Sequence, residues 1–410
     1  MLEEVHVPPL SLDAYAPVAG EDAVAEIRRL AEPLKGARVL HVNATKFGGG
    51  VAEILPTLTG LMRDVGLDAE WRLMPGTDAF FNVTKLIHNG LQGMDIDLDD
   101  ARRRTYAETS ALFAGAFEGE YDFVVIHDPQ PAALRSLCES APGKWIWRCH
   151  IDLTDASPEV WGFLRPMVEA YDAAIFTLPE YVKPDLRIGM LAFVPPSIDP
   201  LSPKNLALDG TLVNDILYRL GVDPHRPLIV QVSRFDHWKD PKGVIRVYRA
   251  VKREIPDLQL SLVGSMATDD PEGFRVWEET EHARGGDKDI FLLSNLHQVG
   301  SVQINAFQRV ANVVVQKSLR EGFGLTVSEA LWKGRPVVGG RAGGIKLQVR
   351  DGYDGYLVDS IEDCARRTIE LLADPVGADA LGAQGREHVR DNFLSTRELE
   401  DWLRLFRELG

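Results

Sequence analysis

Short apolar runs alternate with longer amphipathic stretches along most of the chain. This alternation is typical of parallel α/β structure, in which buried strands are connected by helices. In the first half, the apolar runs that predict strands cover residues 37–44, 68–74, 121–128, 144–150 and 172–178. Amphipathic stretches at 50–66 and 159–172 predict helices between them.

The pattern is interrupted once and then starts again. Residues 193–208 are rich in Pro and Ser without a clear period, so we interpret them as a linker between domains. Beyond them, strands are predicted at 227–235, 258–265, 289–295, 311–318 and 335–340, and helices at 242–255, 301–311 and 325–334. We therefore expect an α/β fold of two doubly wound, Rossmann-like domains, residues 1–200 and 201–394, facing each other across a ligand-binding cleft. A last amphipathic helix, 395–410, can pack back on the first domain.

The 410-residue chain has a formal net charge of −16, which narrows the range of partners. Nucleic acids and anionic membranes bind basic surfaces, so we exclude both, and we leave a homodimer open. Three cysteines, Cys138, Cys149 and Cys364, give neither a disulfide framework nor a zinc-binding spacing. No apolar run approaches the length of a membrane span and the N-terminus has no secretion signal, so we expect a soluble, cytoplasmic protein.

A glycine-rich turn at residues 46–51 leaves a predicted strand and opens a helix. Its glycines, Gly48, Gly49 and Gly50, would let backbone approach a ligand closely, and a helix N-terminus favours negative charge. The turn is not GxGxxG, and no ribose-binding acid follows a clear second strand, which disfavours a nicotinamide or flavin site. A tight turn without a ligand is the alternative.

Charged residues follow two predicted strands of the second half. Arg234 and Lys239 come just after the strand at 227–235, where two cations can hold a phosphate, although Lys239 can equally be a solvated surface lysine. Glu321 and Glu329 flank a turn whose amides lie at the positive end of a helix, and carboxylates accept hydrogen bonds from sugar hydroxyls. The alternative for the two glutamates is a capped helix with a surface side chain.

Metal ligands are not evident. Asp95-Ile96-Asp97 formally matches a DxD motif, but it precedes a helix that begins near Asp99, so we predict helix capping for it. His88, His237 and His297 are scattered and lack metal-ligand spacing, and no protein metal site is predicted.

Together these residues resemble the retaining nucleotide-sugar glycosyltransferases of the GT-B fold, family four. The Arg234–Lys239 pair, the two glutamates and the Gly49-Gly50 turn carry the resemblance. Longer strings are similar to a narrower family, the trehalose synthases of the glycosyltransferring type, from about residue 37 to the end. These strings are HVN (41–43), FGGGVAE (47–53), HDPQP (127–131), WRCHID (147–152) and PPSIDP (195–200).

The resemblance implies a role for each matching residue. Arg234 and Lys239 would neutralise the donor diphosphate, with His150 beside the reacting sugar. Glu321 would hold hydroxyls of the donor sugar and Glu329 those of the ribose. Further donor contacts are expected from Gly49, Gly50, Gly322, Phe323, Gly324, Leu325, Asn295 and Leu296, and acceptor contacts from Asp128, Asn82 and Lys85. Asp240-Pro241 departs from the family pattern, and Lys242 could compete as a phosphate ligand.

The implied reaction transfers glucose from ADP-, UDP- or GDP-glucose to free glucose and forms trehalose with retention at the anomeric carbon. No residue stands out as the nucleophile of a double displacement, so the resemblance implies a front-face displacement without a tightly bound cofactor. A divalent metal can accompany the nucleotide. Three alternatives stay open: a trehalose phosphorylase, another nucleotide-sugar-dependent retaining glycosyltransferase, and a sugar-nucleotide epimerase or inactive binding protein.

Overall fold

The structure is a computed structural model of the whole chain, and it describes residues 2–47, 49–138, 141–266 and 272–410. Gly48, in the first glycine-rich turn, lies outside the described residues. The chain divides into two compact units, which we name unit 1 (Met1–Ser197 with Ser395–Gly410) and unit 2 (Ile198–Leu394). Each is built around one sheet with helices on both faces, so the predicted class of two doubly wound α/β domains is confirmed.

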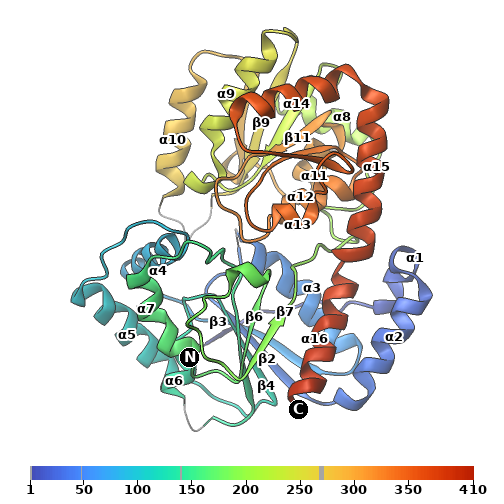
Figure 1. Cartoon of the computed structure of the whole chain (residues 1–410). Helices are drawn as coiled ribbons and strands as arrows, with labels where there is room; N and C mark the ends of the chain where they lie inside the picture. Colours follow the sequence, from blue (N-terminus) through green and yellow to red (C-terminus); the bar gives the residue numbers. More distant parts are fainter. Residues whose placement is uncertain (1, 48, 139–140, 267–271) are drawn as a thin grey trace. The chain divides into compact units, whose positions relative to one another are not determined.

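Unit 1 contains a seven-stranded sheet in the order β1-β3-β2-β4-β5-β6-β7 (Figure 1). Its strands are β1 (Glu3–Glu4), β2 (Arg38–Asn43), β3 (Asp68–Leu73), β4 (Phe123–His127), β5 (Lys144–Arg148), β6 (Ala173–Phe176) and β7 (Met190–Phe193). All neighbours are parallel except β1, which runs antiparallel to β3 at one edge. The order reverses between β2 and β4, so the loops after these two strands leave toward opposite faces, and ligands bind at such a point.

Helices cover both faces of this sheet, which explains why β4 is buried throughout. The helices of unit 1 are η1 (Leu12–Tyr15), α1 (Ala16–Ala19), α2 (Glu21–Ala31), η2 (Glu32–Leu34), α3 (Gly50–Asp64), α4 (Asp78–Leu91), α5 (Asp100–Ala114), α6 (Leu134–Leu137), α7 (Pro158–Val168), η3 (Pro179–Tyr181) and α16 (Ser395–Leu409). Helices α4, α5 and α7 pack on one face, and α2, α3 and α16 lie on the other.

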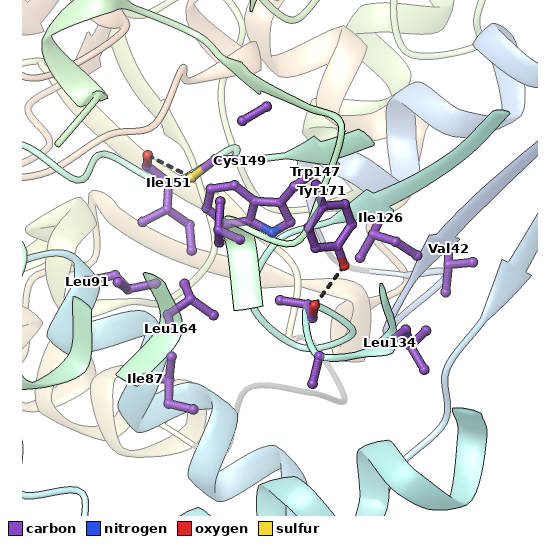
Figure 2. Close-up of a cluster of buried hydrophobic side chains, with 14 of the residues drawn as sticks. Val42, Ile87, Leu91, Ile126, Leu134, Trp147, Cys149, Ile151, Leu164 and Tyr171 are labelled. Atoms are coloured by element: carbon purple, nitrogen blue, oxygen red, sulfur yellow. Dashed lines mark hydrogen bonds between the residues drawn. The ribbon is translucent and has the colours of Figure 1, made fainter. Parts of the chain in front are cut away.

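Successive side chains of each strand point to opposite faces of the sheet, so both faces pack against helices. Figure 2 shows the side packed against α4 and α7, with Trp147 fully buried among aliphatic side chains. On the opposite face, Phe123 of β4 stacks on Phe406 of α16 with ring centroids 4.3 Å apart. His41 of β2 makes a T-shaped contact with Trp402 of the same helix at 5.6 Å. The last helix of the chain is therefore part of the core of unit 1.

Unit 2 contains a parallel six-stranded sheet in the order β10-β9-β8-β11-β12-β13. Its strands are β8 (Leu228–Val232), β9 (Gln259–Gly264), β10 (Ile290–Ser294), β11 (Val313–Gln316), β12 (Val337–Gly340) and β13 (Gly355–Val358). Its helices are α8 (Gly210–Arg219), η4 (His237–Lys239), α9 (Pro241–Lys252), α10 (Gly273–Arg284), η5 (Asn295–His297), α11 (Ser301–Val310), α12 (Leu325–Trp332), α13 (Ile345–Gln348), α14 (Ile361–Ala373) and α15 (Pro375–Asn392). The order reverses between β8 and β11, so their loops again diverge at a ligand-binding position.

The stretch predicted as a linker, 193–208, is not a free connection. Phe193 is the last residue of β7, and the chain from Ile198 onward belongs to unit 2. Asn305 of α11 donates hydrogen bonds to the carbonyls of Pro203 and Leu206 at 3.0 and 2.8 Å. These bonds tie the irregular segment to α11 of unit 2.

Candidate active site

The residues predicted to bind a donor in unit 2 lie at its point of strand reversal. Arg234 and Lys239 follow β8, and Glu321 follows β11, the neighbouring strand in the sheet. The sequence spacing placed each at the end of a strand, but only the sheet order makes the two strands adjacent. The structure brings Lys239 and Glu321 into direct contact.

Lys239 and Glu321 form a close ion pair. The Nζ of Lys239 lies 2.6 Å from each carboxylate oxygen of Glu321, and the two side chains are 17% and 7% exposed. The Ser318 hydroxyl donates a further hydrogen bond to Glu321 Oε2 at 3.0 Å. Gln231 fixes the backbone on the other side by donating to the Lys239 carbonyl at 2.7 Å. A cation and a carboxylate are thus held together at the strand reversal, where doubly wound folds bind ligands.

Asp240 and Pro241, which depart from the family pattern, form the N-terminal cap of α9. Asp240 has a left-handed backbone with φ of 48°, and its carboxylate accepts from the amide of Gly243 at 3.0 Å in the first turn of α9. Lys317 donates to the same carboxylate at 2.7 Å. Lys242 donates to Glu279 at 2.6 Å in an exposed pair, so its ammonium is engaged on the helix surface. Arg234 lies 3.6 Å from Asp236.

The second glycine-rich turn enters α12 through Gly324. Its φ of 87° lies in the left-handed region, which explains the need for glycine, and it supplies no side-chain cap. The Phe323 carbonyl accepts from Gln348 at 2.5 Å. A Cβ on Gly344 would lie 2.5 Å from the Cα of Phe323, so the two loops touch backbone to backbone. The amides from Gly322 to Leu325 therefore sit in a braced turn at the positive end of a helix.

Glu329 is buried inside α12 and has basic and amide partners. Its Oε1 lies 3.1 Å from Nζ of Lys204, and its Oε2 accepts from Gln308 at 3.4 Å. The Asn295 side chain accepts from the Met266 amide at 2.8 Å, whereas Leu296 is 63% exposed. Each of these residues belongs to unit 2.

In unit 1, the corresponding residues follow β2 and β4, which flank the reversal, and β5, the neighbour of β4. Gly49 and Gly50 open α3 after β2, Asp128 follows β4, and His150 follows β5. Gly49 has an ordinary φ of −140°, and a Cβ placed on it would meet no atom within 4 Å in the described structure. The fold itself therefore does not require glycine at this position, which leaves close approach of a ligand as a reason for it.

Asp128 holds the backbone at His150. It has a φ of 63°, a left-handed conformation that Asp tolerates better than most residues. Its Oδ1 accepts from the His150 amide at 2.7 Å, and its own amide donates to the Arg148 carbonyl at 2.9 Å. Burial raises the pKa of Asp128 to about 7, although the His150 amide and the Arg148 charge act in the opposite direction.

Three histidines form a buried chain on this side of the sheet. His41 Nδ1 lies 3.1 Å from His127 Nε2, and His127 Nδ1 lies 3.0 Å from His150 Nε2. Burial lowers the pKa of His41 to about 3 and holds the pKa values of His127 and His150 well below the usual range. The Arg148 guanidinium lowers the last two further, so all three rings are neutral at physiological pH.

The predicted acceptor residues Asn82 and Lys85 lie one turn apart on α4. Asn82 is exposed, whereas Lys85 is buried with 9% of its surface accessible.

The capping role predicted for the DxD motif is wrong. Asp99, outside the motif, accepts from the Arg102 amide at 2.8 Å and caps α5. Asp97 instead contacts the Arg102 side chain, which donates to the Asp97 carbonyl at 2.6 Å and lies 3.6 Å from its carboxylate. Across the described ranges, no cluster of three or more histidine, cysteine or carboxylate side chains is arranged to hold a metal ion.

Several residues of these networks had no role assigned from the sequence. They are His41 and His127 in unit 1, and Lys204, Gln308 and Ser318 in unit 2. For the histidines a signal existed, because each stands near the carboxyl end of a predicted strand, as His150 does. For Lys204 there was none, since it lies in the stretch interpreted as a linker.

The comparisons with known proteins agree with this arrangement. The family model "Trehalose synthase, N-terminal domain" matches residues 41–183, and "Glycosyl transferases group 1" matches 216–388. A trehalose synthase of Rubrobacter xylanophilus is 50% identical over 100% of this chain and 99% of its own. A trehalose phosphorylase of Grifola frondosa is 27% identical over 96% of this chain and 60% of its own. The solved Anabaena HepE in complex with UDP and glucose has a TM-score of 0.70 at 14% identity, covering 91% of this chain and 100% of that one.

Two doubly wound units, with cationic and acidic side chains at the strand reversal, define the class as glycosyltransferases of the GT-B fold. The Rubrobacter trehalose synthase, with 50% identity over nearly the full length of both proteins, identifies the family within this class. It belongs to the trehalose synthase family. In the part of the chain that the structure describes, no helix is long and apolar enough to cross a membrane.

Proposed function

We propose that the chain is a retaining glucosyltransferase that makes trehalose reversibly from NDP-glucose and free glucose. The observation that supports this most is the Lys239–Glu321 pair at the strand reversal of unit 2, with Nζ 2.6 Å from both carboxylate oxygens. A diphosphate needs a cation and a sugar needs hydrogen-bond acceptors, and this pair supplies both in one place.

The donor is assigned to unit 2. Arg234 and Lys239 hold the diphosphate, and Lys239 exchanges its contact with Glu321 for one with phosphate oxygen. Glu321 then accepts from hydroxyls of the donor glucose, while the amides of the turn at 322–325 face the phosphate. Glu329 accepts from the ribose hydroxyls, and the backbone of Asn295 and Leu296 lies near the base. Backbone contacts to the base are compatible with ADP-, UDP- or GDP-glucose.

The acceptor is assigned to unit 1. His150 and Asp128 lie beside the reacting sugars, Gly49 and Gly50 line the donor phosphate, and Asn82 and Lys85 close over the acceptor glucose. Free glucose is favoured over glucose 6-phosphate, because a phosphorylated acceptor needs several cations. Lys46, a candidate near the glycine-rich turn, is paired with Glu3 at 3.0 Å.

Retention follows from a displacement on one face of the donor glucose. The acceptor hydroxyl oxygen forms the new bond to the anomeric carbon as the bond to the diphosphate oxygen breaks, and the acceptor proton passes to that phosphate oxygen. Negative charge builds on the leaving group in the transition state, where Arg234 and Lys239 stabilise it. A double displacement would instead need a carboxylate nucleophile on the opposite face.

Trehalose phosphorylase is the second candidate because one such enzyme is 27% identical to this chain. In that reaction inorganic phosphate would take the place of the nucleotide diphosphate. The buried carboxylate of Glu329 favours the nucleotide, since a phosphate alone would leave it without a ribose to bind.

The two functions separate in the reverse reaction. The full-length enzyme is incubated with trehalose and UDP or ADP, and separately with trehalose and inorganic phosphate, and released glucose is measured. We expect release with a nucleotide diphosphate. Release with phosphate alone would identify a phosphorylase, and no release with either would overturn glycosyl transfer from trehalose. In the forward direction, a panel of NDP-glucose donors is assayed with glucose and with glucose 6-phosphate, and faster transfer to the phosphorylated acceptor would refute the assigned acceptor.

A further inference from the structure

We infer that His41 and His127 fix the tautomer of His150, so that His150 carries its proton on Nδ1 and acts toward the sugar as a hydrogen-bond donor. The tautomer follows from the geometry of unit 1 alone, and the contact with sugar rests on the proposed function. His41 and His127 are positioning residues in this scheme.

The chain of rings leaves two ways to place the protons. A neutral imidazole has one donor and one acceptor nitrogen, and each contact between rings needs one of each. The contacts join His41 Nδ1 to His127 Nε2 at 3.1 Å, and His127 Nδ1 to His150 Nε2 at 3.0 Å. Either all three rings carry the proton on Nδ1, or all three carry it on Nε2.

The environment of His41, at the buried end of the row of three histidines, decides between the two proton arrangements. His41 Nε2 is buried, and among the described residues no hydrogen-bond partner is available to it. Its T-shaped neighbour Trp402 offers a ring rather than an oxygen or nitrogen acceptor. A buried N–H without an acceptor is rarer and more costly than a bare acceptor lone pair, so Nε2 of His41 carries no proton.

The tautomer of His41 then fixes the tautomers of the other two histidines. With its proton on Nδ1, His41 donates to His127 Nε2, and His127 must in turn donate through Nδ1 to His150 Nε2. The proton of His150 is therefore on Nδ1. Neutrality of the rings supports this assignment, since burial lowers the pKa of each and the Arg148 charge disfavours a second proton on His127 and His150.

This arrangement limits what His150 can do. Its Nε2 lone pair is occupied by His127, so it is not available as a general base. Its Nδ1–H can donate to a sugar hydroxyl, and the Asp128 contact to the His150 amide at 2.7 Å holds the backbone in place for this. A ring with the other tautomer would present an acceptor at Nδ1 in place of this donor, which changes the hydrogen bond that it can make to a sugar hydroxyl.

The test uses NMR of the full-length chain labelled with ¹⁵N at histidine, because nitrogen shifts separate protonated from unprotonated ring nitrogens. In the wild type we expect His150 Nδ1 to be protonated and Nε2 not. His127→Asn places an amide nitrogen where Nδ1 lies and should keep this pattern, whereas His127→Leu should give a mixture of tautomers. His127→Leu should also lower kcat about 10- to 100-fold with little change in KM, and His127→Asn should recover most of that loss.

A second pair of variants covers the case in which His127→Leu does not fold. His41→Asn can still donate to His127 Nε2 and should preserve the His150 pattern, whereas His41→Leu should relax it. A wild-type spectrum with the proton of His150 on Nε2, or an unchanged His150 spectrum in both leucine variants, would overturn the inference. The spectra need no turnover, so an expected spectrum without trehalose formation would refute the proposed function and leave the tautomer standing.

Discussion

Lys239 Nζ lies 2.6 Å from both carboxylate oxygens of Glu321, so the cation assigned to the donor phosphate and the carboxylate assigned to the donor sugar are paired with each other. The pair keeps a partly buried charge neutral before any ligand binds. Donor binding must therefore replace an internal ion pair with two new contacts. The same residues serve stability in the free protein and catalysis in the complex.

This pairing makes Lys239→Ala both inactive and less stable. The variant should lose orders of magnitude in kcat, because transition-state charge is no longer neutralised. It should also lose about 2 kcal/mol of unfolding free energy, since Glu321 is left buried without its cation. Urea unfolding and steady-state kinetics measure the two effects.

A double variant separates the two roles. Adding Glu321→Gln to Lys239→Ala should recover part of the stability without recovering activity. Lys242→Ala removes a lysine three positions away that pairs with exposed Glu279, and should change neither quantity greatly. If Lys239→Ala keeps wild-type turnover, the assignment of Lys239 to the leaving group fails.

Glu329→Gln should weaken nucleotide binding while leaving the chemical step alone. A carboxylate accepts more strongly from ribose hydroxyls than an amide does, and the ribose is bound equally in the ground and transition states. We expect KM for the donor to rise about tenfold with little change in kcat. Calorimetric titration with UDP gives the affinity directly. Unchanged UDP affinity would place the ribose elsewhere.

The apolar pattern predicted the central strands because they are buried on both faces, as in β8 and β4. It missed β7 at the edge of the unit 1 sheet, where half-buried and exposed positions alternate over four residues and give a weak signal. It also missed β1 and β13, which have two and four residues.

Part of the site was predictable because its residues stand at the carboxyl ends of predicted strands, which is how Arg234 and Lys239 were found, whereas Asp128 came only from the family resemblance. Their partners were not, because pairing depends on strand order and on segments distant in the chain. Lys204 illustrates this point: it looked like a linker residue, yet it reaches the buried carboxylate of Glu329 at 3.1 Å. The histidine chain likewise needs β2, β4 and β5 to be neighbours.

Asp128→Asn should change how stability depends on pH. The pKa of Asp128 is raised from 3.8 to about 7 by burial, so between these values the native state holds a proton that the unfolded state has lost. This contribution to stability is present below pH 4 and is lost as pH rises toward 7. Asn can keep the left-handed backbone and accept from the His150 amide.

The variant should therefore gain stability relative to the wild type by about 1.4 kcal/mol per pH unit across this window. Urea unfolding of both proteins between pH 4.5 and 7.5 measures the difference. A constant difference over the range would mean that Asp128 is ionised in the folded protein.

His41 should affect the pH dependence of the unfolding free energy in the opposite direction to Asp128. The pKa of His41 is lowered from 6.5 to about 3 by burial, so in acid the unfolded chain binds a proton that the native chain does not. Its contribution to stability is complete above pH 6.5 and is lost as pH falls toward 3. Removing the ring should make the unfolding free energy fall less steeply between pH 6 and 4, by about 1.4 kcal/mol per pH unit. His282→Asn, at an exposed position of α10 with no part in the histidine chain, is the matched control. Equal slopes in wild type and His41→Asn would show that His41 is protonated in the native state, and the all-neutral histidine chain would have to be abandoned.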